Sequence, residues 1–284
     1  TILTSEKEKG DFGQKPKPKM NAFAPPGQEG KWEKKGDMPI PECFSSNVVN
    51  GKIYVVGYDT MQEYDPAADK WTKKADMPTP RAFSSASVVD GKIYVIGGAA
   101  QGPFANLSIV EEYDPETDKW TKKADMPTPR NSLSTSVVNG KIYAIGGMKE
   151  WPMPLSTVEE YNPATDTWTK KADMLIARNS LSTSVVNGRI YAIGGWDNGG
   201  RNVSTIEEYD PATDTWTKKA DMLTARQYVS TSAVNGRIYA IGGMRVWGPP
   251  LSTVEEYDIG FKESQSVNPA GKLPTLWGRL KAAQ

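Results

Sequence analysis

A segment made of glycine, a basic residue, isoleucine and tyrosine recurs along this chain of 284 residues. Its five copies begin at Gly51, Gly91, Gly140, Gly188 and Gly236, at steps of 40, 49, 48 and 48 residues. Each copy leads into a glycine pair (Gly57-Tyr58 in the first copy) and then into a tyrosine preceded by glutamate. In four copies a tryptophan follows that tyrosine after seven residues, at Trp71, Trp120, Trp168 and Trp216. Copies in register at this spacing indicate an array of equivalent structural units.

Each unit has the pattern of four short strands. In the third copy they are predicted at residues 132–138, 141–145, 157–161 and 167–171, all rich in β-branched or aromatic residues. Asn139-Gly140 supplies two residues that tolerate positive φ, which favours a tight hairpin between the first two strands. Proline and aspartate mark the turn before the fourth strand. The repeat therefore predicts one four-stranded antiparallel sheet per copy.

The double glycine, the fixed spacing of tyrosine and tryptophan, and the period near 48 resemble the kelch repeat. The resemblance extends from about residue 31 to residue 258. It implies an all-β fold, a five-bladed β-propeller of four-stranded kelch blades. We expect the propeller at residues 30–260, an N-terminal tail at residues 1–29 and a C-terminal extension at residues 261–284.

The two ends of the repeat array predict how the ring closes. No sequence typical of the tryptophan-containing fourth strand follows Tyr257. Upstream of the first complete repeat, however, residues 31–38 carry the same pattern as residues 119–126. The simplest arrangement places this N-terminal segment as the outer strand of the last blade. Both ends of the array then share one blade.

Composition excludes several functions. Lys plus Arg and Asp plus Glu both number 34, so the chain has no overall charge that would attract nucleic acid. It has no histidine, which removes Ser-His-Asp and Cys-His catalysis and His-based metal sites. Cys43 is the one cysteine, and no apolar run reaches the ~20 residues of a transmembrane helix. We therefore predict no catalytic residues, no metal, no cofactor, no nucleic-acid partner and no transmembrane segment.

The repeats differ mainly in the loops between their second and third strands, in both length and composition. Strand direction places these loops on the same face as the loops that enter each inner strand, and loops on a rigid scaffold commonly carry binding. The predicted binding face carries Arg81, Arg130, Arg178 and Arg226, with Asn131, Asn179, Gln227 and Tyr228 beside them and Phe104, Trp151, Trp196 and Trp247 around them. In the first copy Pro41 or Glu42 replaces the arginine.

Two interpretations of the arginines remain open at this point. In one they bind carboxylate or phosphate groups while the tryptophans stack on a ligand. In the other, four equivalent arginines brace the blades through backbone carbonyls or glutamates. For the whole chain, the resemblance implies a non-catalytic scaffold that binds a protein, a peptide or a small anionic or carbohydrate ligand. The alternatives are a structural propeller without a specific ligand and a carbohydrate-active enzyme.

Overall fold

The computed structural model describes residues 33–41, 45–100, 105–246 and 248–260. These residues form strands, turns and loops and contain no helix, so no helix among them could span a membrane. The contacts divide the chain into residues 1–35 and a compact unit of residues 36–284, and every strand in the described ranges belongs to the second unit.

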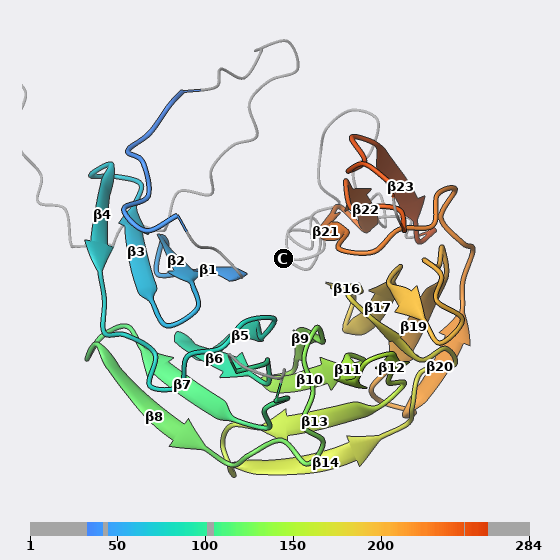
Figure 1. Ribbon diagram of the computed structural model, residues 1–284, viewed down its shortest axis with the longest axis horizontal. Coiled ribbons are helices and arrows are strands. Elements are labelled where there is room, and N and C mark those ends of the chain that lie inside the picture. The colour runs from blue at the N-terminus through green and yellow to red at the C-terminus, as the bar shows by residue number, and fades with distance from the viewer. Residues whose placement is uncertain (1–32, 42–44, 101–104, 247, 261–284) are drawn as a thin grey trace, which may run out of the picture. The chain divides into compact units, whose positions relative to one another are not determined.

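Five antiparallel sheets of this unit are the blades of a β-propeller, which confirms the predicted fold (Figure 1). Their strands are β1 (Ser45–Val49), β2 (Lys52–Val56), β3 (Met61–Asp65) and β4 (Lys70–Lys73) in blade 1; β5 (Ser85–Val89), β6 (Lys92–Ile96), β7 (Val110–Asp114) and β8 (Lys119–Lys123) in blade 2; β9 (Ser134–Val138), β10 (Lys141–Ile145), β13 (Val158–Asn162) and β14 (Thr167–Lys171) in blade 3; β16 (Ser182–Val186), β17 (Arg189–Ile193), β19 (Ile206–Asp210) and β20 (Thr215–Lys218) in blade 4; β21 (Ser230–Val234), β22 (Arg237–Ile241) and β23 (Val254–Asp258) in blade 5.

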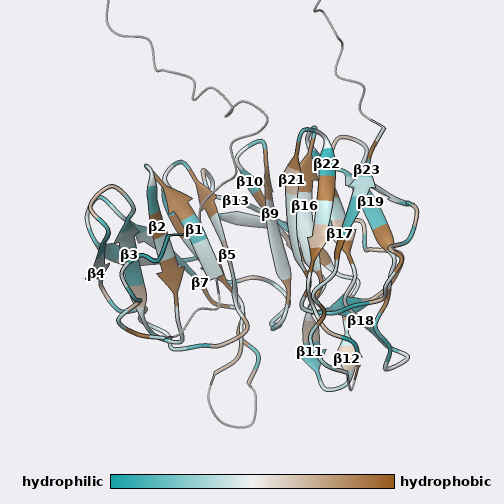
Figure 2. Ribbon diagram, turned by 90° about the horizontal axis from the view of Figure 1, so that it is seen from above, coloured by the Kyte–Doolittle hydropathy of each residue, from teal (hydrophilic) through white to brown (hydrophobic). Residues whose placement is uncertain are grey.

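The chain runs outward through each blade in the order of the strands, so the first strand of every blade is innermost. Inner strands of successive blades contact one another, from β1 to β5, β9, β16 and β21. Further short strands lie in the loops of blades 3 and 4: β11 (Met148–Glu150) pairs with β12 (Met153–Pro154), and β15 (Arg178–Asn179) pairs with β18 (Trp196–Asp197). Figure 2 shows β11, β12 and β18 together at one edge of the blades, where they build one face of the unit.

The core lies between successive blades. Between blades 2 and 3, for example, Tyr94, Ile96, Met126 and Ile142 are buried in one cluster, against which Trp168 packs. The tyrosine of the second strand packs beside the third-strand tyrosine of the next blade, with ring centroids 5.9 Å apart for Tyr94 and Tyr161. The repeated tyrosines therefore form contacts between neighbouring blades, as an array of equivalent repeats requires.

Blade 5 departs from the prediction because its sheet has three strands. Residues 33–38, which were expected to belong to its outer strand, form no strand, and residues 31 and 32 lie outside the described residues. The segment also falls mostly in residues 1–35, which the contacts separate from the unit that carries the blades. Closure of the ring by this segment therefore stays a prediction.

The buried tyrosines make a testable contribution to stability at high pH. Burial raises the pKa of three tyrosine hydroxyls far above its usual value. Hydrogen bonds to aspartates add to this shift: Tyr113 donates to Asp118, Tyr161 to Asp166 and Tyr209 to Asp214.

An acid with a raised pKa in the folded state stabilises the fold fully below its unfolded pKa, about 10 for tyrosine, and loses that contribution as pH rises beyond it. We expect the urea midpoint to hold between about pH 8 and 9.5 and to fall steeply above about pH 10. The tyrosinate absorbance of the buried tyrosines should appear together with unfolding. Ionisation of most of the 12 tyrosines near pH 10 while the fold stays intact would contradict this result.

Candidate functional site

The four predicted arginines are completely buried. Arg178 is typical: its guanidinium donates to the carbonyl oxygens of Gly194 and Thr205 at 3.2 and 2.8 Å and lies 2.6 Å from a carboxylate oxygen of Glu207. Arg81 and Arg226 pair with Glu111 and Glu255, and Arg130 lies 3.0 Å from Glu159. Burial lowers the pKa of Arg130 to about 10, although Glu159 opposes this shift. These arginines tie the loop before each inner strand to the third strand of the same blade.

Blade 1 supports this bracing role. It lacks the arginine, and the third-strand position of the paired glutamate is occupied by Gln62, a neutral residue that is 1% exposed. The side-chain amide of Gln62 donates to the carbonyl of Ile40 and its oxygen accepts from the Ile40 N–H, both at 3.0 Å. A glutamate without its arginine would leave an uncompensated buried charge. Arginine and glutamate thus occur together or not at all, and the four arginines do not belong to the accessible face.

The loops that follow these arginines line the inner edge of the predicted binding face. Phe83, Ser132, Ser180 and Tyr228 each stand two residues after an arginine and have φ between 52° and 56°, a region that costs roughly 1–2 kcal/mol for L-residues. Backbone hydrogen bonds of 2.9 Å connect them in turn: each N–H of Ser132, Ser180 and Tyr228 donates to the carbonyl of the equivalent residue one blade earlier. This chain of bonds holds an unfavourable backbone and aims the side chains of Phe83 and Tyr228 outward, 42% and 55% exposed.

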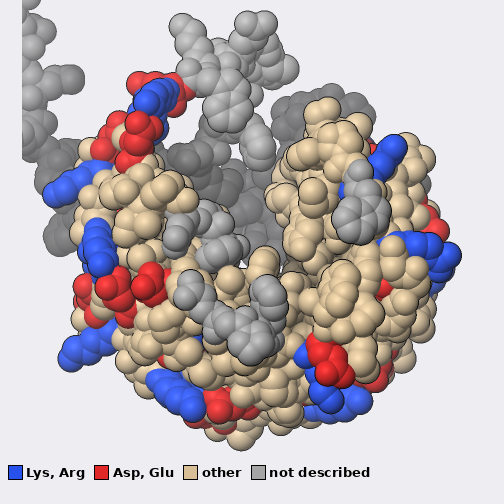
Figure 3. Space-filling model, viewed as in Figure 1, with Lys and Arg blue, Asp and Glu red and all other residues tan. Residues whose placement is uncertain are grey.

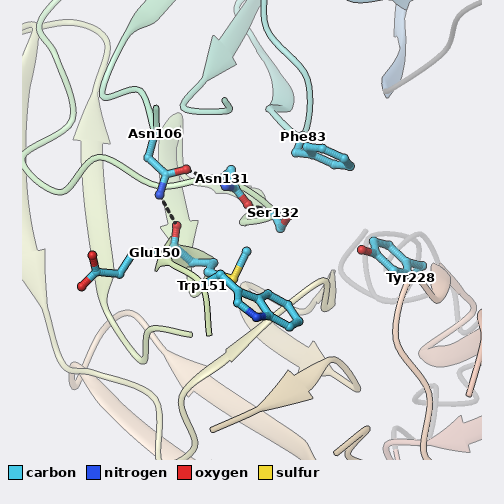
Figure 4. A pocket seen from close by; sticks show the side chains of 8 residues that line it. Phe83, Asn106, Asn131, Ser132, Glu150, Trp151 and Tyr228 are labelled. Atoms are coloured by element: carbon cyan, nitrogen blue, oxygen red, sulfur yellow. Dashed lines mark hydrogen bonds between the residues drawn. The ribbon is translucent and has the colours of Figure 1, made fainter. Parts of the chain in front are cut away.

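A cavity of about 230 Å³ opens beside this inner edge (Figure 4). Its lining comes from both kinds of loop: Phe83, Asn131, Ser132 and Tyr228 precede inner strands, whereas Asn106, Met148, Glu150 and Trp151 follow second strands. A second cavity of about 280 Å³ shares Phe83, Ser132 and Tyr228 and extends over the ends of the inner strands. The structure therefore brings the two predicted loop sets to one hollow.

Asparagine side chains fix the loops that form the hollow. Asn106 donates to the carbonyls of Met148 and Lys149, and the amide of Asn131 donates to the side-chain oxygen of Asn106 at 2.5 Å. Asn202 makes the equivalent bond two blades further on, to the carbonyl of Met244 at 2.7 Å. Each bond joins the loop of one blade to the loop of the next, so the cavity wall is held before any ligand enters.

Aromatic side chains provide exposed apolar surface around the cavity. The Trp151 ring stacks on the Trp196 ring with centroids 5.0 Å apart and an interplanar angle of 16°. Trp196 is 9% exposed and forms the support, while Trp151 is 74% exposed. Figure 4 shows Phe83, Trp151 and Tyr228 around the same opening.

Apart from the four buried arginines, the predicted site residues divide into three groups. Asn131, Trp151 and Tyr228 line the cavity. Asn179 and Trp196 are buried supports, and the Gln227 N–H pairs with the Met244 carbonyl. Phe104 and Trp247 lie outside the described residues. Sequence reasoning missed Phe83, although it stands at the same distance from Arg81 as Tyr228 from Arg226.

The sheets, their order and the hollow at the loop face define the class of protein: a β-propeller with a preformed cavity on its loop-bearing face. A family model described as the KLHDC2/KLHL20/DRC7 Kelch-repeats domain matches residues 29–174, and the Kelch motif matches residues 177–223 and 225–269. The chain belongs to the kelch-repeat family, and kelch propellers generally mediate protein binding.

Comparison with solved structures supports the same fold. The structure titled "Structure of YjhT" has a TM-score of 0.66 and 19% sequence identity, over 72% of this chain and 73% of that one. At this identity the likeness concerns the fold alone. A search of curated proteins found no match to the chain.

Proposed function

We propose that this protein is a non-catalytic binding module whose loop face receives a segment of a partner protein in the cavity bounded by Phe83, Trp151 and Tyr228. The observation that supports this most is the combination of three exposed aromatic rings with a hollow whose walls are braced by hydrogen bonds. Binding hot spots are enriched in tryptophan and tyrosine seated at preformed hollows.

The charge of the lining favours a neutral or basic segment. Glu150 is the only charged side chain that lines this cavity among the described residues. The four arginines on which an anionic ligand would depend are buried and paired with glutamates or bonded to carbonyls. We therefore favour a peptide that places an apolar side chain against Trp151 and a neutral or basic group near Glu150.

The carboxylates of the repeated glutamate pairs have structural partners, which supports a non-catalytic role. The first glutamate of each pair holds the buried arginine, as Glu207 holds Arg178. The second accepts a tyrosine hydroxyl, as Glu160 accepts from Tyr143 at 2.7 Å, and the Lys141 ammonium lies 2.7 Å from the same carboxylate. Within the described residues no group of histidine, cysteine, aspartate or glutamate is arranged to hold a metal ion.

The test is a selection of peptides from a random phage-displayed library on the wild-type protein, followed by affinity measurements on variants. For the selected peptides we expect Trp151→Ala and Tyr228→Ala each to weaken binding at least tenfold, about 1.4 kcal/mol. Both side chains are more than half exposed, so neither substitution should change the melting temperature much.

Leu175→Ala is the matched control, because Leu175 is 60% exposed and lines none of the cavities described. It should leave the affinity unchanged. Equal binding to all three variants would place the peptides elsewhere and refute the proposal. Selective binding of acidic sugars that is lost in Trp151→Ala would instead favour a carbohydrate ligand.

A further inference from the structure

Asparagine is followed by glycine at five places in the described residues: Asn50-Gly51, Asn139-Gly140, Asn187-Gly188, Asn198-Gly199 and Asn235-Gly236. In such a pair the glycine nitrogen can attack the side-chain amide of the asparagine, because glycine has a permissive backbone and no side chain to block the approach. All five asparagines are exposed, so access to solvent does not distinguish them. Their backbone conformations do.

Four of the five pairs form the two-residue turns between the first and second strands of their blades. Their asparagines have φ of 50° to 52° and their glycines φ of 72° to 78°, as expected for mirror-image hairpin turns. In this left-handed conformation the following nitrogen points away from the asparagine's own Cβ, so it cannot reach the side-chain amide. Five facing residue pairs of the two strands hold each turn closed.

The fifth pair, Asn198-Gly199, lies in the loop between β17 and β19 and is built differently. Asn198 is not among the residues with positive φ. The N–H of Gly200 donates to the Asp197 carbonyl at 3.1 Å, and the N–H of Asp197 donates to the Arg201 carbonyl at 2.9 Å. The strand that enters this turn, β18, has two residues. A turn closed by so few bonds opens more often than a hairpin between five-residue strands.

A carboxylate lies at the nitrogen that would react. The N–H of Gly199 donates to Oδ1 of Asp197 at 2.9 Å, and this N–H must give up its proton when its nitrogen attacks. The Arg201 N–H also donates to Oδ1 of Asp197, at 3.0 Å, and holds the carboxylate in place. Among the described residues no hydrogen bond restrains the Asn198 side chain, so its amide is free to turn toward Gly199.

We propose that Asn198 is a site of spontaneous deamidation in the folded protein. The nitrogen of Gly199 forms a bond to Cγ of Asn198, and the bond between Cγ and the side-chain nitrogen breaks. That nitrogen leaves as ammonia with the proton that Gly199 has lost. Water then opens the resulting cyclic imide at either of its two carbonyls, which gives aspartate or isoaspartate at position 198.

The modified loop supports the aromatic surface of the cavity. Trp196 pairs with Asn202 across the turn and with Asn179 of β15, and its ring stacks on Trp151 at a centroid distance of 5.0 Å. Isoaspartate adds an atom to the main chain and disturbs this pairing, whereas aspartate places a second negative charge beside Asp197. Conversion should therefore weaken binding at Trp151, a consequence that rests on the proposed function, although the modification itself does not.

The test is incubation of the full chain in mildly alkaline buffer, followed by digestion and peptide mass spectrometry. We expect Asn198 to convert roughly tenfold faster than the asparagines of the four hairpin turns, or more, because its turn opens more readily. In urea the difference should largely disappear, since the hairpins no longer hold their left-handed conformation. Conversion in the folded protein that is equal at all five positions, or absent at Asn198, would overturn the proposal.

Gly199→Ala is the matched control for the chemistry. It places a methyl group beside the attacking nitrogen, at a position where a Cβ would meet side-chain atoms of Arg201 and Asp197 at 3.0 and 3.2 Å. It should slow conversion of Asn198 and leave the rates at the four hairpin turns unchanged. An unchanged rate at Asn198 would contradict attack by the Gly199 nitrogen.

The link to binding is measured with a peptide selected on freshly prepared protein. After incubation the wild-type protein should lose affinity for this peptide in proportion to the converted fraction. Asn198→Gln should keep its affinity through the same treatment, because the larger imide ring that glutamine requires forms far more slowly. Conversion without loss of affinity would refute the link to Trp151 and leave the modification site standing, whereas failure to select any peptide would count against the proposed function alone.

Discussion

Replacing Glu207 with glutamine will lower the free energy of unfolding by about 3–5 kcal/mol, as expected when one partner of a buried ion pair is removed. The side chains of Glu207 and Arg178 are both 0% exposed and their charged atoms lie 2.6 Å apart. Burial alone raises the pKa of Glu207 and lowers that of Arg178, so each charge depends on the other. Glutamine would leave the guanidinium charged without compensation, and urea denaturation measures the loss.

Two further variants separate the charge effect from general damage. Glu116→Gln, in an exposed turn, should change stability by less than about 0.5 kcal/mol. Arg178→Met combined with Glu207→Gln should recover a substantial part of the loss, because blade 1 folds with Gln62 and no arginine. A double variant less stable than Glu207→Gln would mean that the arginine acts through packing and carbonyl contacts rather than through the pair.

The substitution Gly146→Ala will lower the free energy of unfolding by about 3 kcal/mol. Alanine would have to adopt a left-handed backbone conformation there, and its Cβ would collide with neighbouring atoms. Gly146 has φ of 62°, and a Cβ there would lie 2.5 Å from the Arg178 carbonyl oxygen and 3.0 Å from Met174. That carbonyl accepts the N–H of Gly147, so the loop that carries Arg178 cannot move away without breaking this bond. The midpoint of urea denaturation gives the measurement.

Gly140→Ala is the control for Gly146→Ala. Gly140 has a similar φ of 72°, but nothing lies within 4 Å of the added Cβ. It should cost only about 1 kcal/mol, the conformational part alone. Equal losses at the two positions would contradict the collision with the Arg178 carbonyl as the main cause of the loss at Gly146.

The strands were predictable because each is determined locally. The predicted ranges 141–145 and 167–171 coincide with β10 and β14, and β13 begins one residue later than predicted. The pairing of β11 with β12 was not predicted, since Met148 and Glu150 have no alternating apolar pattern that marks a strand. A repeat therefore predicts what every copy shares and says little about the loop that only one copy has.

The position of the cavity was predictable, whereas the residues that line it were predictable only in part. The antiparallel order of the strands brings both loop sets to one face, and Trp151 and Tyr228 lie there. The arginines recur at equivalent positions as a structural device does, and only the structure shows that they are buried beneath that face. Whether an arginine is exposed depends on the third strand folding over it, a contact between residues about 30 positions apart that spacing alone does not reveal.

Hydrogen–deuterium exchange of the wild-type protein, with and without a peptide selected on it, tests the proposed binding face most directly. The account predicts slower exchange in the presence of peptide at residues 82–84, 130–132, 148–151 and 227–229, which line or adjoin the cavity. Figure 3 shows that the charged side chains visible in this view lie mainly toward the outer rim of the blades. Exchange at the hairpin turns Asn139-Gly140 and Asn187-Gly188, which join first to second strands, should stay unchanged. Protection confined to those turns or to the outer strands, with none around Trp151 and Tyr228, would contradict the account.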